Sequence, residues 1–231
     1  MLSIHPDFYC EFMVVGRERT PVIIIDNLIK DAHHLVDYCS THYNFSKVDN
    51  FYPGVRMHAP KMYIHTLYDY LSELFASIFD VPKNNLSGGR SFYSLVTTPP
   101  EQLKHQQCLP HVDSYQYGDF ACVHYLCDKK LGGTSLYRHR RTGFERITEE
   151  RVGLYNEAVI DEGALSGSLN SYMNGPNEYF DQIACVDAVF NRMVVYPANV
   201  LHSGNISKEF PFDSNPLSGR LTLNSFIYSK R

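Results

Sequence analysis

The feature that most constrains the fold is a series of short β-rich segments that begins at residue 90 and runs to the end of the chain. Each segment is rich in β-branched or aromatic residues and is followed by polar or glycine-containing sequence, as is typical of strands in antiparallel sheets. The segments are residues 90–97, 120–127, 133–139, 192–197, 200–204 and 220–229. This succession favours a sandwich or barrel over a doubly wound α/β fold, in which strands and helices alternate.

The residues before this series carry one strand and the clearest helices. Residues 20–26 form a continuous β-branched run, and residues 28–43 follow with apolar side chains at helical spacing. Residues 61–81 show the longest apolar stripe of helical period and are bounded by prolines on both sides. Residues 53–60, which begin and end with proline, are interpreted as a loop.

A polar stretch at about residues 148–190 interrupts the strands and is interpreted as a helical insertion. Its predicted helices are residues 148–159 and 175–190. A chain of 231 residues suits one domain of generous size. We therefore expect a single domain over residues 1–231, with a strand and supporting helices up to residue 89 and a β-core with the helical insertion from residue 90 onward.

Composition limits the classes of partner. The formal net charge of −4 and the sequence pI of about 6.2 argue against nucleic-acid binding, which usually requires a basic surface. No segment has the length of a transmembrane helix, and the start of the chain does not resemble a signal peptide. The six cysteines are scattered without metal-binding spacing, which fits a reducing compartment. We expect a cytoplasmic protein that binds neither nucleic acid nor membrane.

The residues most indicative of chemistry are His111 and Asp113, which follow a proline. Side chains two apart on a strand point to the same side, so this pair supplies two ligands to one cavity. His202, at the end of an apolar strand 91 residues later (202 − 111), is the candidate third ligand. Two imidazoles and one carboxylate form the facial triad of non-heme Fe(II) oxygenases, which leaves coordination positions open.

A keto-acid co-substrate that chelates iron has a second, distal carboxylate, which needs a fixed cation when it is buried. Arg220, at the start of the last predicted strand, is the candidate for this cation. Thr222 shares its face of the strand and is positioned to donate a hydrogen bond to the same carboxylate. Arg192, one strand earlier, is the alternative cation.

Four segments in this order resemble the 2-oxoglutarate/Fe(II)-dependent dioxygenase superfamily, nearest its prolyl-hydroxylase-like branch. They are "LPHVD" (109–113), "VHYLCDKKLGGTSLY" (123–137), "NRMVVYPANVLHSG" (191–204) and "GRLTL" (219–223), within a match that covers roughly residues 90–229. The resemblance implies an α+β, mainly β fold, a double-stranded β-helix (jelly roll) with N-terminal supporting helices and a helical insertion. The interval between the distal histidine and the arginine is longer here than is usual in the superfamily.

Carried over by position, the resemblance implies that His111, Asp113 and His202 bind Fe(II) and that Arg220 and Thr222 bind 2-oxoglutarate. It also implies a phenol against the co-substrate, for which Tyr125 and Tyr93 are the two candidates. The implied cofactors are Fe(II), 2-oxoglutarate and dioxygen, with ascorbate as a candidate reductant.

The implied activity is that of a non-heme iron dioxygenase of the hydroxylase type. Oxidative decarboxylation of 2-oxoglutarate to succinate would be coupled to hydroxylation of a small-molecule or peptidyl substrate. Two alternatives stay open: a cupin-like or zinc metalloenzyme that does not use 2-oxoglutarate, and a non-catalytic member of the fold that acts as a binding module. The sequence predicts neither the substrate nor the oligomeric state.

Overall fold

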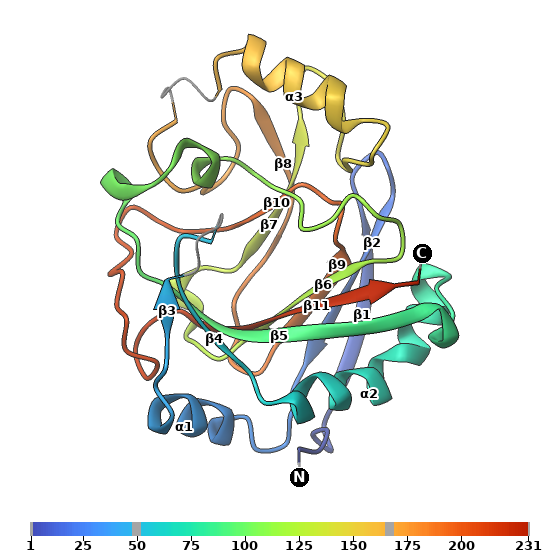
Figure 1. Cartoon of the computed structure of the whole chain (residues 1–231), viewed down its shortest axis with the longest axis vertical. Coiled ribbons are helices and arrows are strands. Elements are labelled where there is room, and N and C mark those ends of the chain that lie inside the picture. The colour runs from blue at the N-terminus through green and yellow to red at the C-terminus, as the bar shows by residue number, and fades with distance from the viewer. Residues whose placement is uncertain (1, 48–51, 165–168, 231) are drawn as a thin grey trace.

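The computed structural model describes residues 2–47, 52–164 and 169–230, which fold into two antiparallel β-sheets with helices outside them (Figure 1). In this part of the chain the large sheet has the strand order β1-β2-β9-β6-β11-β5-β4-β3, and the small sheet has the order β10-β7-β8. The strands of the large sheet are β1 (Tyr9–Val15), β2 (Thr20–Asp26), β3 (Ser46–Lys47), β4 (Gly54–His58), β5 (Leu86–Val96), β6 (Phe120–Tyr125), β9 (Met193–Pro197) and β11 (Leu221–Ser229). Those of the small sheet are β7 (Thr134–His139), β8 (Phe180–Val186) and β10 (His202–Gly204).

Helices α1 and α2 lie beside the large sheet, and α3 lies at the opposite end of the molecule, near β8 (Figure 1). The α-helices are α1 (His33–Thr41), α2 (Lys61–Phe79) and α3 (Val152–Asp161), and the short 3-10 helices are η1 (Lys83–Asn85), η2 (Pro100–Gln102), η3 (His105–Cys108) and η4 (Lys129–Leu131). Helix α2 begins directly after Pro60 and ends at Asp80, which adopts the left-handed conformation at φ 56°. None of the helices described is both long and apolar enough to cross a membrane.

The two faces of the large sheet bury different sets of side chains. Tyr93 and Leu223 pack with the residues of α1 and α2, in the core outside the sheet. Val96 and Tyr125 point to the other side and pack with Leu136 of the small sheet. Alternation along each strand therefore decides whether a side chain joins the helical core or the space between the sheets, where the candidate site lies.

Several predicted elements are confirmed. Helices α1 and α2 lie within the predicted helical ranges 28–43 and 61–81, and α3 overlaps the predicted helix at 148–159. The predicted strand at residues 20–26 is β2. The described part of the chain is mainly β, with antiparallel sheets and separate helices, as expected.

The predicted helix at residues 175–190 is wrong, because this stretch contains strand β8. Its residues pair with β7 from Thr134↔Val186 to His139↔Phe180, so backbone bonding to a neighbouring strand overrides the local pattern. The insertion predicted for about residues 148–190 is therefore helical only in α3 among the described residues, and residues 165–168 lie outside them.

The loop predicted at residues 53–60 is also wrong, since it contains strand β4 between its two prolines. Strand β4 pairs with β5 through Arg56↔Ser94 and Met57↔Tyr93, which places residues of this stretch on the inner face of the large sheet. The sequence analysis also missed strand β1, an edge strand that pairs with β2.

Candidate metal centre and its cavity

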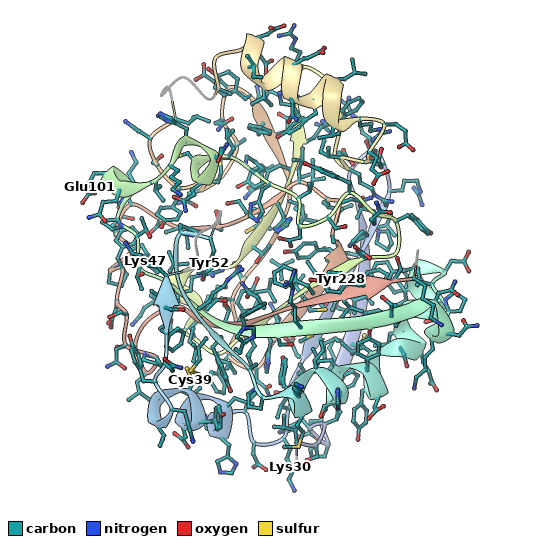
Figure 2. All side chains as sticks on the ribbon, in the orientation of Figure 1. Lys30, Cys39, Lys47, Tyr52, Glu101 and Tyr228 are labelled. Carbon is teal, nitrogen blue, oxygen red and sulfur yellow. The ribbon has the colours of Figure 1, made fainter. Side chains whose placement is uncertain are left out.

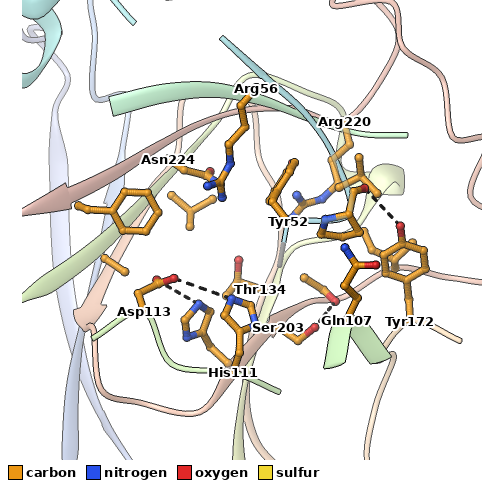
Figure 3. A pocket seen from close by; sticks show the side chains of 18 of the residues that line it. Tyr52, Arg56, Gln107, His111, Asp113, Thr134, Tyr172, Ser203, Arg220 and Asn224 are labelled. Atoms are coloured by element: carbon orange, nitrogen blue, oxygen red, sulfur yellow. Dashed lines mark hydrogen bonds and ion pairs between the residues drawn. The ribbon is translucent and has the colours of Figure 1, made fainter. Parts of the chain in front are cut away.

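His111 and His202 lie opposite each other at the edge of the small sheet. They form an antiparallel bridge in which the backbone N–H of each residue donates to the carbonyl oxygen of the other, both at 2.9 Å. Asp113 is held by its own backbone N–H, which donates to the carbonyl oxygen of Ala198 at 2.8 Å. Two segments that are far apart in sequence thus fix three side chains around one point (Figure 3).

One ligand atom from each of His111, Asp113 and His202 lies within 4.8 Å of the other two. The Asp113 Oδ2 atom is 3.3 Å from His202 Nε2, and Oδ1 is 3.8 Å from His111 Nε2. The structure therefore brings together the three residues that the sequence analysis predicted as ligands. Two nitrogens and one oxygen at these separations are a donor set that suits a divalent transition metal.

The orientation of His202 is fixed by a second contact. Its Nδ1 atom lies 2.9 Å from the carbonyl oxygen of Val200, which can only accept a hydrogen bond, so Nδ1 carries the proton. In the neutral ring, Nε2 then presents a lone pair toward the Asp113 carboxylate. Two acceptors that face each other need a proton or a cation between them. A carbonyl group bonded to the other ring nitrogen, as Val200 is here, is a common way to orient a histidine that ligates a metal.

The electrostatics of the triad agree with this geometry. Burial works against charge on His202, but Asp113 and the Val200 carbonyl together raise the pKa of His202. Burial also opposes ionisation of Asp113, yet His202, His111 and Arg56 lower the pKa of this carboxyl. Nearly half of the His111 side chain is exposed, but its surface faces the cavity, and desolvation there together with His202 lowers its pKa to about 4. His111 is therefore a neutral ligand in the physiological range.

Arg220 is buried in the wall of the same cavity, with 4% of its surface exposed. Its Nε donates to the carbonyl oxygen of Gly132 at 2.9 Å and its Nη2 to that of Gly133 at 2.7 Å. No carboxylate among the described residues lies within ion-pair distance of Arg220, so the charge is stabilised by these carbonyl dipoles and by the ring of Tyr125, 5.9 Å from Cζ. A buried guanidinium in this state favours a bound anion.

The glycine pair Gly132 and Gly133 makes these two bonds to Arg220 geometrically possible. Gly132 has a positive φ of 82°, and a Cβ atom there would collide with the carbonyl oxygen of Asn205. A Cβ atom at Gly133 would collide with the carbonyl oxygen of Val186. Without side chains the turn can pack closely between its neighbours and present both carbonyls to Arg220.

Thr222 and Tyr125 lie next to each other across strands β11 and β6. Thr222 is fully buried and its Oγ1 atom has no hydrogen-bond partner. The Tyr125 hydroxyl donates to Thr134 Oγ1 at 2.6 Å, and burial raises the pKa of Tyr125, so the phenol stays protonated. A buried hydroxyl without a partner is unfavourable, and an acceptor such as a carboxylate bound at Arg220 would satisfy it.

Tyr93, the second tyrosine candidate, is not in the cavity. On β11 its partner is Leu223, not Thr222, so Tyr93 lies on the outward face of the large sheet with Leu223. It packs in the helical core, where its ring centre is 6.3 Å from that of Tyr38. The inward position of β5 opposite Thr222 belongs to Ser94. The prediction that Tyr93 contacts the co-substrate is therefore corrected. It assigned Tyr93 to the inner face of β5, which is occupied instead by the next residue, Ser94.

Two other basic residues, Arg192 and His124, have their side chains bonded away from the cavity. Arg192, the alternative cation, makes a two-point ion pair with Asp26 at 2.6 and 2.8 Å and does not line the cavity. His124 lies on the outward face of β6, where Tyr63 and Asn191 bond its two ring nitrogens at 2.9 and 3.1 Å. Burial lowers the pKa of His124 to about 4, so it is a neutral core residue.

The sequence analysis missed three residues that line the cavity: Tyr52, Arg56 and Asn224. Arg56 was hidden because its strand was interpreted as a loop. Asn224 follows Arg220 and Thr222 at the same two-residue period, so strand parity alone identifies it. Its Oδ1 atom is buried and unpaired, as are the Tyr52 hydroxyl and Arg56 Nε.

The cavity has two connected parts. The inner part, of about 100 Å³, reaches from the triad to Arg220 and Thr134 between the sheets. The outer part, of about 540 Å³, extends past Leu109 and Tyr155 toward the surface. His111, Asp113 and Arg56 line both parts, so the triad lies where the outer cavity meets the inner one.

Residues 6–227 match the model of a family described as "Family of unknown function (DUF6445)", and the chain therefore belongs to that family. No curated protein matched the sequence. Among solved structures, HygX from Streptomyces hygroscopicus with nickel, 2-oxoglutarate and hygromycin B bound matches with a TM-score of 0.46 and 14% identity, over 93% of this chain and 87% of that one.

Two structures from nogalamycin biosynthesis also match. The non-heme alpha ketoglutarate dependent carbocyclase SnoK has a TM-score of 0.48 and 10% identity, over 91% of this chain and 80% of that one. The non-heme alpha ketoglutarate dependent epimerase SnoN has a TM-score of 0.46 and 9% identity, over 92% and 79%. These values are too low to assign a fold or a reaction, which must be inferred from the chain's own geometry.

Proposed function

We propose that this member of DUF6445 is an Fe(II)- and 2-oxoglutarate-dependent oxygenase. One observation carries the proposal: a single cavity is lined by a His-Asp-His triad and by a buried arginine that has no carboxylate partner among the described residues. The triad suits a divalent metal and the arginine suits a carboxylate. A keto acid that chelates the metal with one end has the other end free for Arg220.

The strand arrangement supports a jelly roll. Strands β9, β6, β11 and β5 lie side by side in the large sheet, and β8, β7 and β10 continue through the His202–His111 bridge as the opposing layer. A four-stranded antiparallel layer that faces a second layer of three strands and the bridging residue His111 is the arrangement expected of a double-stranded β-helix. Membership of the prolyl-hydroxylase-like branch remains a proposal that rests on the sequence motifs.

His111, Asp113 and His202 would hold the iron, and three protein ligands leave positions open for a chelating co-substrate. Bound iron and 2-oxoglutarate would together supply the oxidation of a substrate C–H bond, with succinate and carbon dioxide as the co-products. The protein's contribution is to orient the ligands, to hold the co-substrate and to keep the pocket dry. The Val200 carbonyl fixes the ligating tautomer of His202.

Arg220 would hold the distal carboxylate of 2-oxoglutarate, and Thr222 Oγ1 would donate a hydrogen bond to it. Tyr125, whose ring centre is 5.9 Å from Arg220 Cζ, would position the guanidinium through a cation–π contact. A zinc hydrolase needs no such cation, and a binding module without chemistry needs no triad. The combination therefore favours the oxygenase over both alternatives, with hydroxylation as the expected reaction.

The proposal is tested by titrating 2-oxoglutarate into the protein loaded with Ni(II), which has the charge of Fe(II) but does not react with dioxygen under these conditions. We expect metal-dependent binding of 2-oxoglutarate, much weaker binding of glutarate, which lacks the keto group, and weak binding to Arg220→Gln. Arg192→Gln is the matched control, since its guanidinium is paired with Asp26. If 2-oxoglutarate binds equally with and without metal, or equally to Arg220→Gln, the proposal is wrong.

The remaining expectations are unchanged. The substrate is expected to be a small molecule or a peptidyl group, with no nucleic-acid partner, and the expected compartment is the cytoplasm. Ascorbate is kept as a candidate reductant for the iron.

A further inference from the structure

The outer cavity contains an arginine whose charge has no counter-ion. Arg56 comes from β4 and points into the cavity from the side opposite His111 (Figure 3). Within residues 2–47, 52–164 and 169–230, no carboxylate lies within ion-pair distance of Arg56. Its Nε atom is buried and has no hydrogen-bond partner. Other arginines of the chain differ: Arg138, Arg140, Arg141, Arg151 and Arg192 each pair with a carboxylate.

Aromatic rings hold Arg56 in this position. The guanidinium carbon lies 4.1 Å from the ring centre of Tyr52 and 5.7 Å from those of Phe92 and Phe226. These contacts stabilise the cation and restrict its rotamers, but the rings accept no N–H hydrogen bonds in the plane of the fork. The donors of Arg56 are therefore pre-oriented and free for an acceptor in the cavity.

The rest of the outer cavity is mainly apolar, with neutral polar groups such as Gln106 and Asn156 and a second arginine at its rim. Leu109, Val112, Ile147, Val159 and Leu201 line it. Arg90 stands at the exposed rim, where its Nε donates to the Tyr228 hydroxyl at 2.7 Å; Figure 2 labels Tyr228 and Tyr52, two aromatic residues of the wall. Asp113 is the one carboxylate among the described residues of the wall, and it faces the metal position.

We propose that the outer cavity binds a substrate with an apolar body and an anionic group, a carboxylate or a phosphate, and that Arg56 binds this anionic group. This inference rests on the proposed function, because it takes the molecule in the outer cavity to be the substrate of the triad. When a divalent cation occupies the triad, Asp113 no longer offers a free negative charge, and the cavity carries only positive charge. A volume of about 540 Å³ is within the range of small-molecule sites.

The position of Arg56 also determines which part of the substrate reaches the metal. Arg56 lines both the inner and the outer cavity, so an anion bound to it lies beside the triad rather than at the surface. The apolar body then extends along the outer cavity. The reacting carbon is expected within a few bonds of the anionic group.

The test uses three aromatic probes: benzoate, phenyl phosphate and the neutral benzamide. Each is titrated into Ni(II)-loaded protein with saturating 2-oxoglutarate, which prevents the anions from binding at Arg220, and into the metal-free protein. The variants are Arg56→Gln, which removes the charge, and Arg56→Lys, which keeps the charge but lacks the planar guanidinium group. Arg141→Gln is the matched control, because it removes a surface arginine that pairs with Asp161.

We expect at least one anion to bind the wild type about tenfold or more tighter than benzamide, a difference of about 1.4 kcal/mol. Arg56→Gln should abolish this preference, Arg56→Lys should keep part of it, and Arg141→Gln should keep all of it. The tighter of benzoate and phenyl phosphate identifies the anion class. The inference is wrong if no probe binds, if benzamide binds as tightly as both anions, or if the preference survives Arg56→Gln.

A failure of the proposed function would look different. If the protein does not bind 2-oxoglutarate, the proposed function fails. Titrations of benzoate and phenyl phosphate into the metal-free and the Ni(II)-loaded protein then still measure whether Arg56 binds the anion. Anion binding that disappears when 2-oxoglutarate is added would locate the anion at Arg220 and overturn the role of Arg56. Circular dichroism of each variant checks that the fold is retained.

Discussion

Two buried histidines on opposite sides of the large sheet, His124 and His202, show how the same residue type serves stability in one place and chemistry in another. His124 has both ring nitrogens bonded, to the hydroxyl of Tyr63 and to the side chain of Asn191. His202 has one nitrogen bonded, to the Val200 carbonyl, and its other nitrogen points at Asp113 and His111. A histidine with all its bonds made belongs to the core, whereas one with a free, oriented nitrogen is available as a ligand.

Several polar atoms on the inner face of the large sheet are also unpaired. The inner face of the large sheet leaves Thr222 Oγ1, Asn224 Oδ1 and Arg56 Nε without partners. Unpaired buried polar atoms lower the stability of a fold, and those of Asn224 and Arg56 line the cavity, where a ligand would satisfy them. The following substitutions test this contrast between the two faces.

The largest effect is expected for His202→Ala on metal affinity. The substitution removes a direct ligand, so the affinity for Ni(II) should fall by more than the ~10- to 100-fold that loss of an outer partner costs. Equilibrium dialysis measures the change. His124→Leu is the comparison and should bind Ni(II) like the wild type; equal binding by His202→Ala would remove His202 from the site.

His124→Leu should instead destabilise the fold. It leaves the Tyr63 hydroxyl unpaired in the core and removes one bond from Asn191, which keeps its two bonds to the Ile29 backbone; the free energy of unfolding should fall by roughly 1–3 kcal/mol. Urea denaturation followed by circular dichroism measures this loss. A change below about 0.5 kcal/mol would show that water or a rearranged core satisfies the two groups.

The third prediction concerns pH. Burial lowers the pKa of His124 from 6.5 to about 4, so between these values the unfolded chain binds a proton that the folded chain does not. Stability contributed by neutral His124 is complete above pH 6.5 and is lost as the pH falls toward 4. This loss in the free energy of unfolding is up to about 3 kcal/mol, from 2.5 pH units at 1.36 kcal/mol each, and it should be absent in His124→Leu.

This comparison needs urea denaturation of both proteins, without metal, at several pH values between 4 and 7. Carboxylates and His111 titrate in both proteins, so only the difference in slope between them reports on His124. Parallel pH profiles for the wild type and His124→Leu would contradict the prediction.

The smallest effects compare Thr222 and Tyr93, whose hydroxyls are both buried and unpaired but on opposite faces of the large sheet. Thr222→Val should weaken 2-oxoglutarate binding by about tenfold while leaving stability unchanged or higher by about 1 kcal/mol. Tyr93→Phe should leave 2-oxoglutarate binding unchanged. Calorimetric titration of the Ni(II)-loaded variants measures both, and a loss of binding in Tyr93→Phe would place that tyrosine back in the site.

Much of the site was predictable because it depends on strand periodicity. His111 and Asp113 are two residues apart and both line the cavity, and so do Arg220 and Asn224 at twice that spacing, with Thr222 between them on the same face of β11. The helices α1 and α2 were predictable from their apolar stripes. These features follow from local spacing, which the sequence states directly.

The rest depends on pairing between distant segments. The sequence of β8 alone also fits a helix. It forms a strand because it pairs with β7. Arg56 lies on the cavity wall because β4 pairs with β5, although two prolines make that stretch look like a loop. Tyr93 was misplaced because the loop after β5 hides the register between β5 and the following segments. Such errors come from tertiary contacts that no local pattern encodes.

The central claim is that the open histidine, its two partners and Arg220 form one site for iron and 2-oxoglutarate. Anaerobic titration of the protein with Fe(II) and then 2-oxoglutarate tests it most directly, since the chelate on iron gives a weak visible charge-transfer band. We predict a band that requires both components, is absent in Asp113→Ala and His202→Ala, and needs far more 2-oxoglutarate in Arg220→Gln. No band with the wild type, or a titration unchanged in Arg220→Gln, would contradict the claim.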